Sequence, residues 1–356
     1  MKSKKMFLVT GCAGFIGFHF TLKLLKLGHN VIGIDNINNY YDQSLKKNRV
    51  KEIFKVLKRT KGKFKFIKCD INNNKKLEKI FKKNNFYYVI HFAAQAGIRF
   101  SKKEPKKYFE TNLLGFGNIL ENSRKFNIKH FVFASSSSVY GMSKAIPYSE
   151  KFSDSDHPLQ LYAATKRSNE ILAHSYSYLY QMKVTGLRFF TVYGPWGRPD
   201  MALFTFTKKI LEGKKIQVFN NGNHFRDFTY IDDIIEGISK VITRPKKNKK
   251  FRLNKKILFD PSSSVSDFEI YNIGNGKPIK LSKFIDIIEA NLGIKSKKIL
   301  LKKQLEDMEK TYCNNSKIKK DLNFSSKTTI SFGIKKFIEW YLLYYKKNKN
   351  IYEKTL

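Results

Sequence analysis

The chain has 356 residues, 42% of them hydrophobic and 15% aromatic, so it can bury a core shared by two lobes. Its 69 Lys and Arg against 29 Asp and Glu give a net charge of +40, which would attract nucleic acid, anionic membranes or acidic metabolites. The excess is spread through KK and KNKK stretches, which favours lysine-rich compositional drift over a dedicated nucleic-acid surface. A nucleic-acid-binding protein remains the alternative.

The cysteines Cys12, Cys69 and Cys313 lie far apart and match no metal or disulfide spacing, which predicts a reducing compartment and no metal site. The N-terminal MKSKKMFLVT passes from a short basic segment into a strand, without the apolar region of a signal peptide. No apolar run reaches 18 residues. We therefore expect a soluble, cytoplasmic protein.

Short β-rich runs alternate with helix-period stretches such as FIGFHFTLKLLKLG and NLLGFGNILENSRKFN. This alternation predicts an α/β fold, a Rossmann doubly wound parallel sheet. The expected strands are 6–10, 31–34, 64–68, 87–92, 131–134 and 184–189.

After Phe190 the rhythm gives way to loops rich in Gly, Pro and aromatic residues. We expect residues 1–190 to bind a dinucleotide and residues 191–356 to form a smaller substrate-binding lobe. The run FEIYNIG at 268–274 is expected to return to the first sheet, which would interleave the lobes. Residues 244–267 lack a clear period and are expected to form an exposed loop.

A glycine motif, TGCAGFIG, lies between the first strand and the first helix. Gly11, Gly14 and Gly17 predict a tight turn at which a pyrophosphate meets a helix N-terminus. Asp35 ends the second strand, where a carboxylate accepts hydrogen bonds from ribose hydroxyls and repels a 2′-phosphate. The motif therefore predicts NAD rather than NADP. The alternative for Asp35 is a carboxylate that begins a loop.

Further cofactor contacts are expected at the ends of the third and fourth strands. Asp70 is a candidate acceptor for the adenine amino group, or else a helix N-cap. Ala93 and Ala94 in HFAAQAG keep the strand exit small enough for a dinucleotide to lie across it. Asn112 is expected to satisfy backbone groups there, or else to be a surface residue.

Proton-transfer chemistry is indicated by Tyr162 and Lys166 in LYAATK, which are four residues apart on one predicted helix. The strand tip FVFASSSS places Ser136 beside them, although a shift by one serine remains open. Lys166 is expected to lower the tyrosine pKa and to hold the nicotinamide ribose. The same spacing occurs in Tyr140/Lys144 and Tyr345/Lys349, but only Tyr162 opens a long helical stretch.

The strand tip also limits the reaction. Between Ser136 and Tyr140 there is no carboxylate to eliminate water or remove a second proton, so simple oxidation followed by reduction is expected. Ser137 is expected to contact the substrate.

In this order TGCAGFIG, GIDN, HFAAQAG, ASSSSVYG, YAATK and RDFTYIDD resemble the extended short-chain dehydrogenase/reductase family, over about residues 6–345. The run LRFFTVYGPWGRPDMALF, with GIDNINNYYD and HFAAQAGIRFS, is similar to UDP-glucuronate 4-epimerases within the NAD-dependent epimerase/dehydratase group. The resemblance implies exchange of UDP-glucuronate and UDP-galacturonate through a 4-keto intermediate with bound NAD. The alternatives are a UDP-glucose or other nucleotide-sugar 4-epimerase, and an NAD-linked nucleic-acid-binding protein.

The resemblance also implies substrate contacts. Arg198 would hold the sugar carboxylate, Thr191 the hexose, Arg226 the diphosphate and Phe219 the uracil; a surface arginine and a core aromatic are the alternatives for Arg198 and Phe219. Arg99 would face the cleft without an assigned role.

The C-terminal part departs from the related epimerases. Where they tend to read QPGDV and TYAD, this chain has QLEDM and TYCN, and Asp307 is the remaining candidate for the nucleotide ribose. A homodimer is implied through helices near 106–126 and 160–180.

Overall fold

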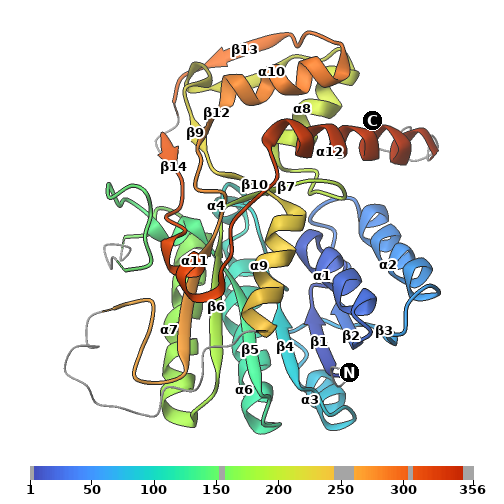
Figure 1. Cartoon of the computed structure of the whole chain (residues 1–356), viewed down its shortest axis with the longest axis vertical. Helices are drawn as coiled ribbons and strands as arrows, with labels where there is room; N and C mark the ends of the chain where they lie inside the picture. Colours follow the sequence, from blue (N-terminus) through green and yellow to red (C-terminus); the bar gives the residue numbers. More distant parts are fainter. Residues whose placement is uncertain (1–3, 152–156, 244–259, 304–307, 348–356) are drawn as a thin grey trace.

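The computed structural model describes residues 4–151, 157–243, 260–303 and 308–347. Its centre is a seven-stranded parallel sheet in the order β11-β6-β5-β4-β1-β2-β3 (Figure 1). This order confirms the predicted α/β, doubly wound Rossmann sheet. The strands are β1 (Met6–Thr10), β2 (Asn30–Asp35), β3 (Phe64–Lys68), β4 (Tyr88–His91), β5 (His130–Ser136), β6 (Val184–Phe189) and β11 (Phe268–Ile273).

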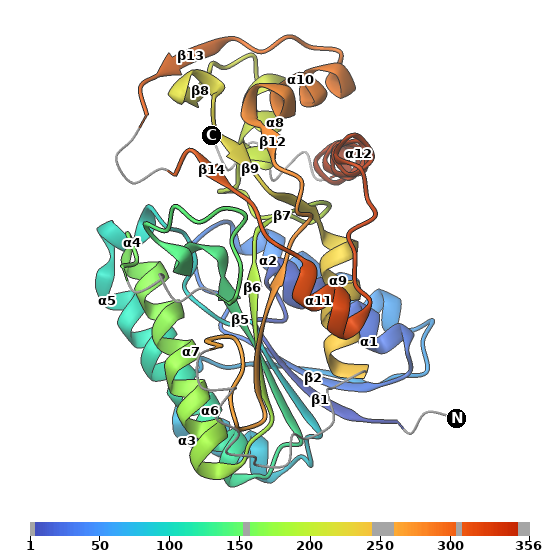
Figure 2. The ribbon, with the colours of Figure 1, turned by 60° about the vertical axis from the view of Figure 1, so that its left-hand side comes forward.

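Helices cover both faces of the sheet (Figure 2). Because each inner strand is then buried on two sides, it is apolar nearly throughout, as in VIGI and FVFA. One face carries α1 (Phe15–Lys26), α2 (Gln43–Leu57) and α9 (Ile231–Thr243), and the other carries α3 (Asn74–Lys82), α6 (Phe116–Lys125) and α7 (Leu161–Tyr180). None of the helices in the described part of the chain has the length and apolar character needed to cross a bilayer.

The second lobe lies beyond the carboxyl ends of the sheet strands, at the top of Figure 1. Its helices are α8 (Ala202–Leu211), α10 (Leu281–Leu292) and α12 (Ile330–Lys347). Its strands are β7 (Thr191–Tyr193), β8 (Ile216–Phe219), β9 (Phe225–Arg226), β10 (Phe228–Tyr230), β12 (Ile279–Lys280), β13 (Lys298–Leu301) and β14 (Lys310–Thr311). The short elements are α4 (Phe100–Lys103), α5 (Pro105–Tyr108), η1 (Phe109–Gly115), η2 (Ser137–Tyr140), η3 (Asn220–Gly222) and α11 (Ser316–Leu322).

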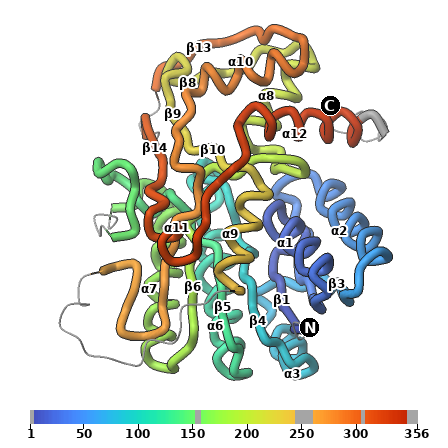
Figure 3. The backbone as a smooth tube through the Cα atoms, viewed as in Figure 1, coloured from blue at the N-terminus to red at the C-terminus, as the bar shows by residue number. Residues whose placement is uncertain are grey.

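The chain crosses between the lobes more than once (Figure 3). Strand β11 pairs in parallel with β6, and α11 packs on β11 before the chain rises again to α12. Later segments therefore complete the first sheet. The division into a dinucleotide-binding part, 1–190, and a substrate-binding part, 191–356, remains a prediction.

The prediction of an exposed loop over 244–267 is wrong for its last part, and residues 244–259 lie outside the described residues. Ser262 is fully buried, and its hydroxyl and carbonyl oxygens accept hydrogen bonds from the Lys317 ammonium at 2.6 and 2.8 Å. The polar composition misled the prediction because Ser262 bonds to Lys317 and Ser264 to His174, both far away along the chain.

Candidate active site

The glycine turn after β1 is shaped by close backbone approaches. Gly11 has φ +69°, and a Cβ there would lie 2.8 Å from the Ala93 nitrogen; a Cβ on Gly17 would lie 2.1 Å from the Gly11 carbonyl oxygen. Larger residues at these two positions would displace the backbone. Gly14 precedes α1, whose first turn lines the cleft at the carboxyl ends of the strands. This is the geometry that accommodates a pyrophosphate at a helix N-terminus.

Asp35 lines the same cleft at the end of β2. Its carboxylate accepts the backbone N–H of Ala13 at 3.2 Å and of Ile37 at 2.8 Å, so the carboxylate also organises the loop that it begins. Burial raises the pKa of Asp35, although the nearby Lys46 ammonium opposes this shift. Burial in turn lowers the pKa of Lys46 to about 8. The sequence analysis missed Lys46, which follows Asp35 by eleven positions in the printed sequence.

The neighbouring strand exits are polar and tightly bonded. Asp70 lies beside the cleft rather than lining it; its carboxylate accepts from the Asn36 side chain at 2.8 Å and the Asn72 N–H at 2.9 Å. The helix N-cap alternative for Asp70 is wrong, because Asn73 caps α3.

Asn112 is buried within the π-helical turn η1, so the surface alternative for it is wrong as well. Its side chain accepts from the Gln95 N–H at 2.8 Å and donates to the Gln95 carbonyl at 3.0 Å. The prediction that it satisfies backbone groups near the exit of β4 is confirmed. Ala93 and Ala94 both line the cleft there.

Ser136, Tyr162 and Lys166 all line this cleft. Ser136 ends β5, and Tyr162 and Lys166 lie one turn apart near the start of α7, which begins at Leu161 as the helical spacing predicted. The Ser136 hydroxyl is hydrogen-bonded to Tyr162, and it accepts from the Ser138 hydroxyl at 2.9 Å. The Lys166 ammonium donates to the Ala134 carbonyl at 3.0 Å.

The pKa values in this group are governed by burial. Burial raises the pKa of Tyr162, and the Arg198 charge and the bond to Ser136 act against that rise. The sequence predicts that Lys166 supplies this charge, but the Arg198 guanidinium of the second lobe supplies it. Burial also lowers the pKa of Lys166 to about 8, while the carboxylate of Glu170 opposes the decrease.

The competing pair Tyr140/Lys144 does not form such a site. Tyr140 is buried in the 3-10 turn η2, stacks on Tyr148 and donates its hydroxyl to the Asn272 side-chain oxygen at 2.8 Å. Lys349, the partner expected for Tyr345, lies outside the described residues.

The opposite wall of the cleft carries Arg198 with two partners that the sequence analysis missed. The Arg198 Nε donates to Asp200 at 3.0 Å, its Nη2 donates to the second carboxylate oxygen, and the Tyr40 hydroxyl donates to that oxygen at 3.0 Å. The surface alternative for Arg198 is wrong, because its side chain is only 23% exposed and faces the cleft. The available signal for Asp200 was its place two residues after Arg198 in GRPDM.

The remaining substrate candidates are spread along this wall. Thr191, Ser137 and Arg226 line the cleft. The Arg226 guanidinium donates to the Phe225 carbonyl at 3.0 Å. Phe219 is partly buried, outside the cleft lining, and its ring lies 4.7 Å below the Arg99 guanidinium. Asp307 lies outside the described residues.

One cleft of about 1260 Å³ therefore joins most of the predicted residues. Among those that line it are Gly11, Gly14, Gly17, Asp35, Ala93, Ala94, Ser136, Ser137, Tyr162, Lys166, Thr191, Arg198 and Arg226. A volume of this order holds a dinucleotide together with a second nucleotide-sized molecule.

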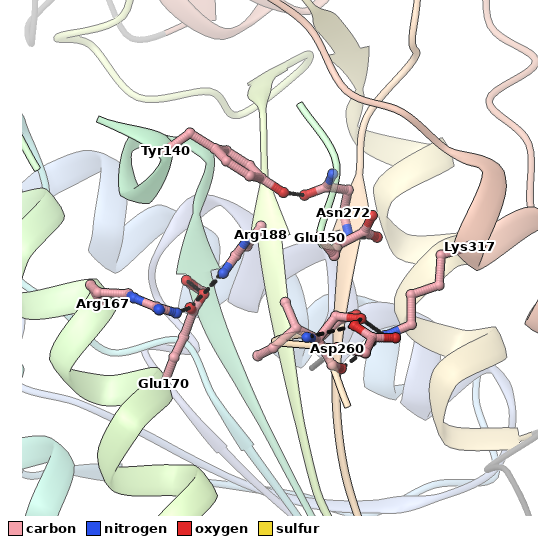
Figure 4. A network of polar contacts seen from close by, with 11 residues as sticks. Tyr140, Glu150, Arg167, Glu170, Arg188, Asp260, Asn272 and Lys317 are labelled. Atoms are coloured by element: carbon pink, nitrogen blue, oxygen red, sulfur yellow. Dashed lines mark hydrogen bonds and ion pairs between the residues drawn. The ribbon is translucent and has the colours of Figure 1, made fainter. Parts of the chain in front are cut away.

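A buried polar network begins on α7 beside Lys166 and runs to β6 (Figure 4). Glu170, one turn beyond Lys166, accepts from Arg188 on β6 through Nε and Nη2, both at 2.8 Å. The two side chains are 2% and 1% exposed. The sequence analysis missed the Glu170–Arg188 pair. The available signal was Glu170 itself, which lies on the same helix face as Lys166 four residues earlier.

Comparisons with known proteins agree with this geometry. Residues 7–274 match the model of the NAD dependent epimerase/dehydratase family. The chain is 49% identical to Protein CapI of Staphylococcus aureus over 96% of this chain and 99% of that protein. It is 43% identical to UDP-glucuronate 4-epimerase 4 of Arabidopsis thaliana, over 96% of this chain and 76% of that protein.

A crystal structure of UDP-glucuronic acid 4-epimerase from Bacillus cereus, in complex with UDP-glucuronic acid and NAD, superposes with a TM-score of 0.82. It is 31% identical and covers 96% of this chain and 100% of that one. The family model, matched over residues 7–274, covers the glycine turn, the tip of β5 and the helix that carries Tyr162. The chain therefore belongs to the NAD dependent epimerase/dehydratase family.

Proposed function

We propose that this chain interconverts UDP-glucuronate and UDP-galacturonate with bound NAD. The observation that carries the proposal is that Tyr162 and Arg198 line one cleft, near enough for the Arg198 charge to act on the tyrosine. A proton acceptor and a carboxylate-binding guanidinium are the two groups that a uronate epimerase requires close together. The names of the relatives in Arabidopsis and Bacillus cereus support this substrate.

The residues along the β1 and β4 exits fit NAD. The turn at Gly11 and Gly17 accommodates the pyrophosphate, Asp35 accepts from the adenosine ribose, and Ala93 and Ala94 leave room for the dinucleotide. Asp70 does not line this surface, but it accepts a hydrogen bond from the Asn36 side chain and so orients Asn36 for a contact with the adenine. Lys166 is placed to donate to the nicotinamide ribose. When bound, NAD supplies a hydride acceptor that returns the same hydride.

Tyr162 removes the proton of the sugar 4-hydroxyl as C4 loses its hydride, and Ser136 donates a hydrogen bond to the same oxygen. The result is a 4-keto sugar. After the sugar turns in the cleft, C4 regains the hydride on its other face, and Tyr162 returns the proton to the oxygen. The net redox change is zero, so the cofactor does not need to leave.

The second wall holds the substrate. Arg198 binds the uronate carboxylate, Thr191 and Ser137 contact the hexose, Arg226 binds the diphosphate, and Phe219 lies near the uracil. The 4-keto uronate is a β-keto acid, and a guanidinium that holds its carboxylate out of the cleavage plane limits loss of carbon dioxide. A ribose contact by Asp307 remains a prediction.

UDP-glucose is the second candidate substrate, because Asp200 already pairs with Arg198 and a neutral sugar would therefore leave no unpaired guanidinium. To test the proposal, purified protein is incubated with each UDP-sugar without added cofactor and the products are separated. Formation of UDP-galacturonate from UDP-glucuronate is expected. Turnover of UDP-glucose alone, or a UDP-pentose as the main product, would contradict the proposal.

We also propose a homodimer formed through the face of α6 and α7. Three apolar side chains of α7 support it, since Ile171, Leu172 and Leu179 are 58%, 40% and 62% exposed. Large exposed apolar residues gathered on one side of a helix are typical of a contact surface. A cytoplasmic location remains a prediction.

A further inference from the structure

The tip of β5 is tied to α7 by two hydrogen bonds at adjacent residues, one part-buried and one buried. The Lys166 ammonium donates to the Ala134 carbonyl at 3.0 Å, and the Ser135 hydroxyl donates to the Glu170 carboxylate at 2.5 Å. Ser136 follows immediately along the strand. Strand and helix therefore share a fixed register where the reacting groups meet.

Arg188 and Arg167 hold the Glu170 carboxylate in place. Arg188 binds Glu170 in a bidentate manner from β6, and Arg167 donates to it at 3.1 Å from the outer side of α7. Burial raises the pKa of Glu170, but the Arg188 charge, the hydrogen bonds from Arg188 and Ser135 and the Arg167 charge together lower the pKa overall. Glu170 is therefore an anion with one oxygen directed at Ser135.

The network continues to the far edge of the sheet (Figure 4). The Arg188 guanidinium lies over the Tyr140 ring at 4.7 Å, and the Tyr140 hydroxyl donates to Asn272 on β11. The Asn272 N–H donates to Glu150 at 2.7 Å. The turn after Ser136 is thereby fixed by β11, a strand from the C-terminal half of the chain.

Titratable groups face Lys166 from two elements, α7 and β4. Glu170 and Tyr162 lie on its own helix, and the ring of Tyr162 is 6.0 Å from the ammonium. His91 on β4 is held neutral, because burial and the Lys166 charge lower its pKa to about 3. Glu170 is therefore the anion that acts on Lys166 among the described residues.

We propose that Glu170 is a positioning residue of the reaction, which holds Ser136 on β5 in register with Tyr162 and Lys166 on α7 through Ser135 and Arg188, and keeps Lys166 charged. The inference rests on the proposed function, because it assigns the proton transfer to Tyr162. The Glu170 carboxylate thus has two roles, one in the position of Ser136 and one in the charge of Lys166. Separate variants distinguish them.

Glu170→Gln tests the charge. Lys166 is protonated below its pKa and neutral above it, so loss of the neighbouring anion moves the alkaline decline of kcat to lower pH, by about half to one pH unit. Arg167→Gln removes a charge of the opposite sign and is expected to move that decline to higher pH. Glu52→Gln, which breaks an exposed pair with Lys55, is the matched control and leaves the profile unchanged. A uniform loss of rate at every pH in Glu170→Gln would overturn the charge role.

Ser135→Ala tests the geometry without changing charge, and it applies even where Glu170→Gln fails to fold. We expect kcat to fall about ten- to hundredfold while KM and bound NAD stay constant, and Ser135→Thr, which keeps the hydroxyl, to recover most of the rate. A kcat within twofold of wild type in Ser135→Ala overturns the positioning role. Wild-type protein in the same assay tests the proposed function separately, because an inactive wild type contradicts that function, whereas an active one with unaffected variants contradicts only this inference.

Discussion

The wall of the cleft that carries Gly17 and Tyr162 comes from contiguous motifs at the carboxyl ends of parallel strands, and the facing wall comes from side chains of distant loops. On the first wall, close backbone approaches decide the shape of the glycine turn, since a Cβ on Gly17 would meet a carbonyl oxygen. On the second, Arg198 is held by Asp200, which in turn binds Tyr40 from 160 residues away. The end of a strand fixes the position of a side chain such as Ser136. The orientation of the Arg198 guanidinium depends on contacts among loop residues.

The contrast suggests that chemistry and specificity separate between the two walls. Substitutions on the first should remove the reaction or the cofactor for every substrate, and substitutions on the second should change which sugar is used. The predictions below test that separation.

Tyr162→Phe should have the largest effect. Loss of the proton acceptor should lower kcat by about 10²–10⁴-fold on both UDP-glucuronate and UDP-glucose, while circular dichroism and bound NAD stay unchanged. Initial rates from product separation measure the loss. A rate equal to that of the wild type would contradict the assignment of the base.

Arg198→Ala should act on one substrate. A charged hydrogen bond contributes about 1.5–3 kcal/mol, so kcat/KM for UDP-glucuronate should fall about ten- to hundredfold and for UDP-glucose far less. The unrestrained 4-keto uronate should also release carbon dioxide and give a UDP-pentose.

Arg198→Lys is the matched control for this prediction, because it keeps the charge and loses the bidentate geometry. An unchanged ratio of the two activities in Arg198→Ala would transfer the carboxylate to another group, with Arg99 the next candidate.

Gly17→Ala should weaken cofactor retention. The added Cβ would lie 2.1 Å from the Gly11 carbonyl, and relieving such overpacking costs about 1–3 kcal/mol. We expect purified Gly17→Ala to hold markedly less NAD, measured by its absorbance after denaturation. Gly117→Ala on α6 meets no atom within 4 Å and should retain the wild-type amount. Equal NAD content in the two variants would show that this turn does not bind the pyrophosphate.

Leu179→Glu should change assembly and leave chemistry nearly intact. The side chain is 62% exposed on α7, and a charge there should separate a dimer into monomers at micromolar concentration, measured by analytical ultracentrifugation. Leu343→Glu on α12, where the side chain is 61% exposed, is the control and should remain dimeric. Wild-type protein that sediments as a monomer would contradict the dimer.

The doubly wound sheet, the glycine turn and the start of α7 were predictable from the sequence, because each depends on residues close together in the chain. A glycine at a crowded turn, a buried apolar strand and a helix that begins near Tyr162 leave local patterns. The same reasoning placed Ser136 and Lys166 on the elements that meet at the cleft.

Side-chain partners were decided only by the tertiary structure. Asp200 on Arg198, Glu170 on Arg188 and Lys46 beside Asp35 are pairs of charges, and a chain with a net charge of +40 offers each carboxylate many cations. Composition and spacing do not rank these candidates, because the energy of a pair depends on its distance and burial after folding. For the same reason, the sequence predicted the groups that we propose carry out the reaction, and the packing of the two lobes decided their electrostatic environment.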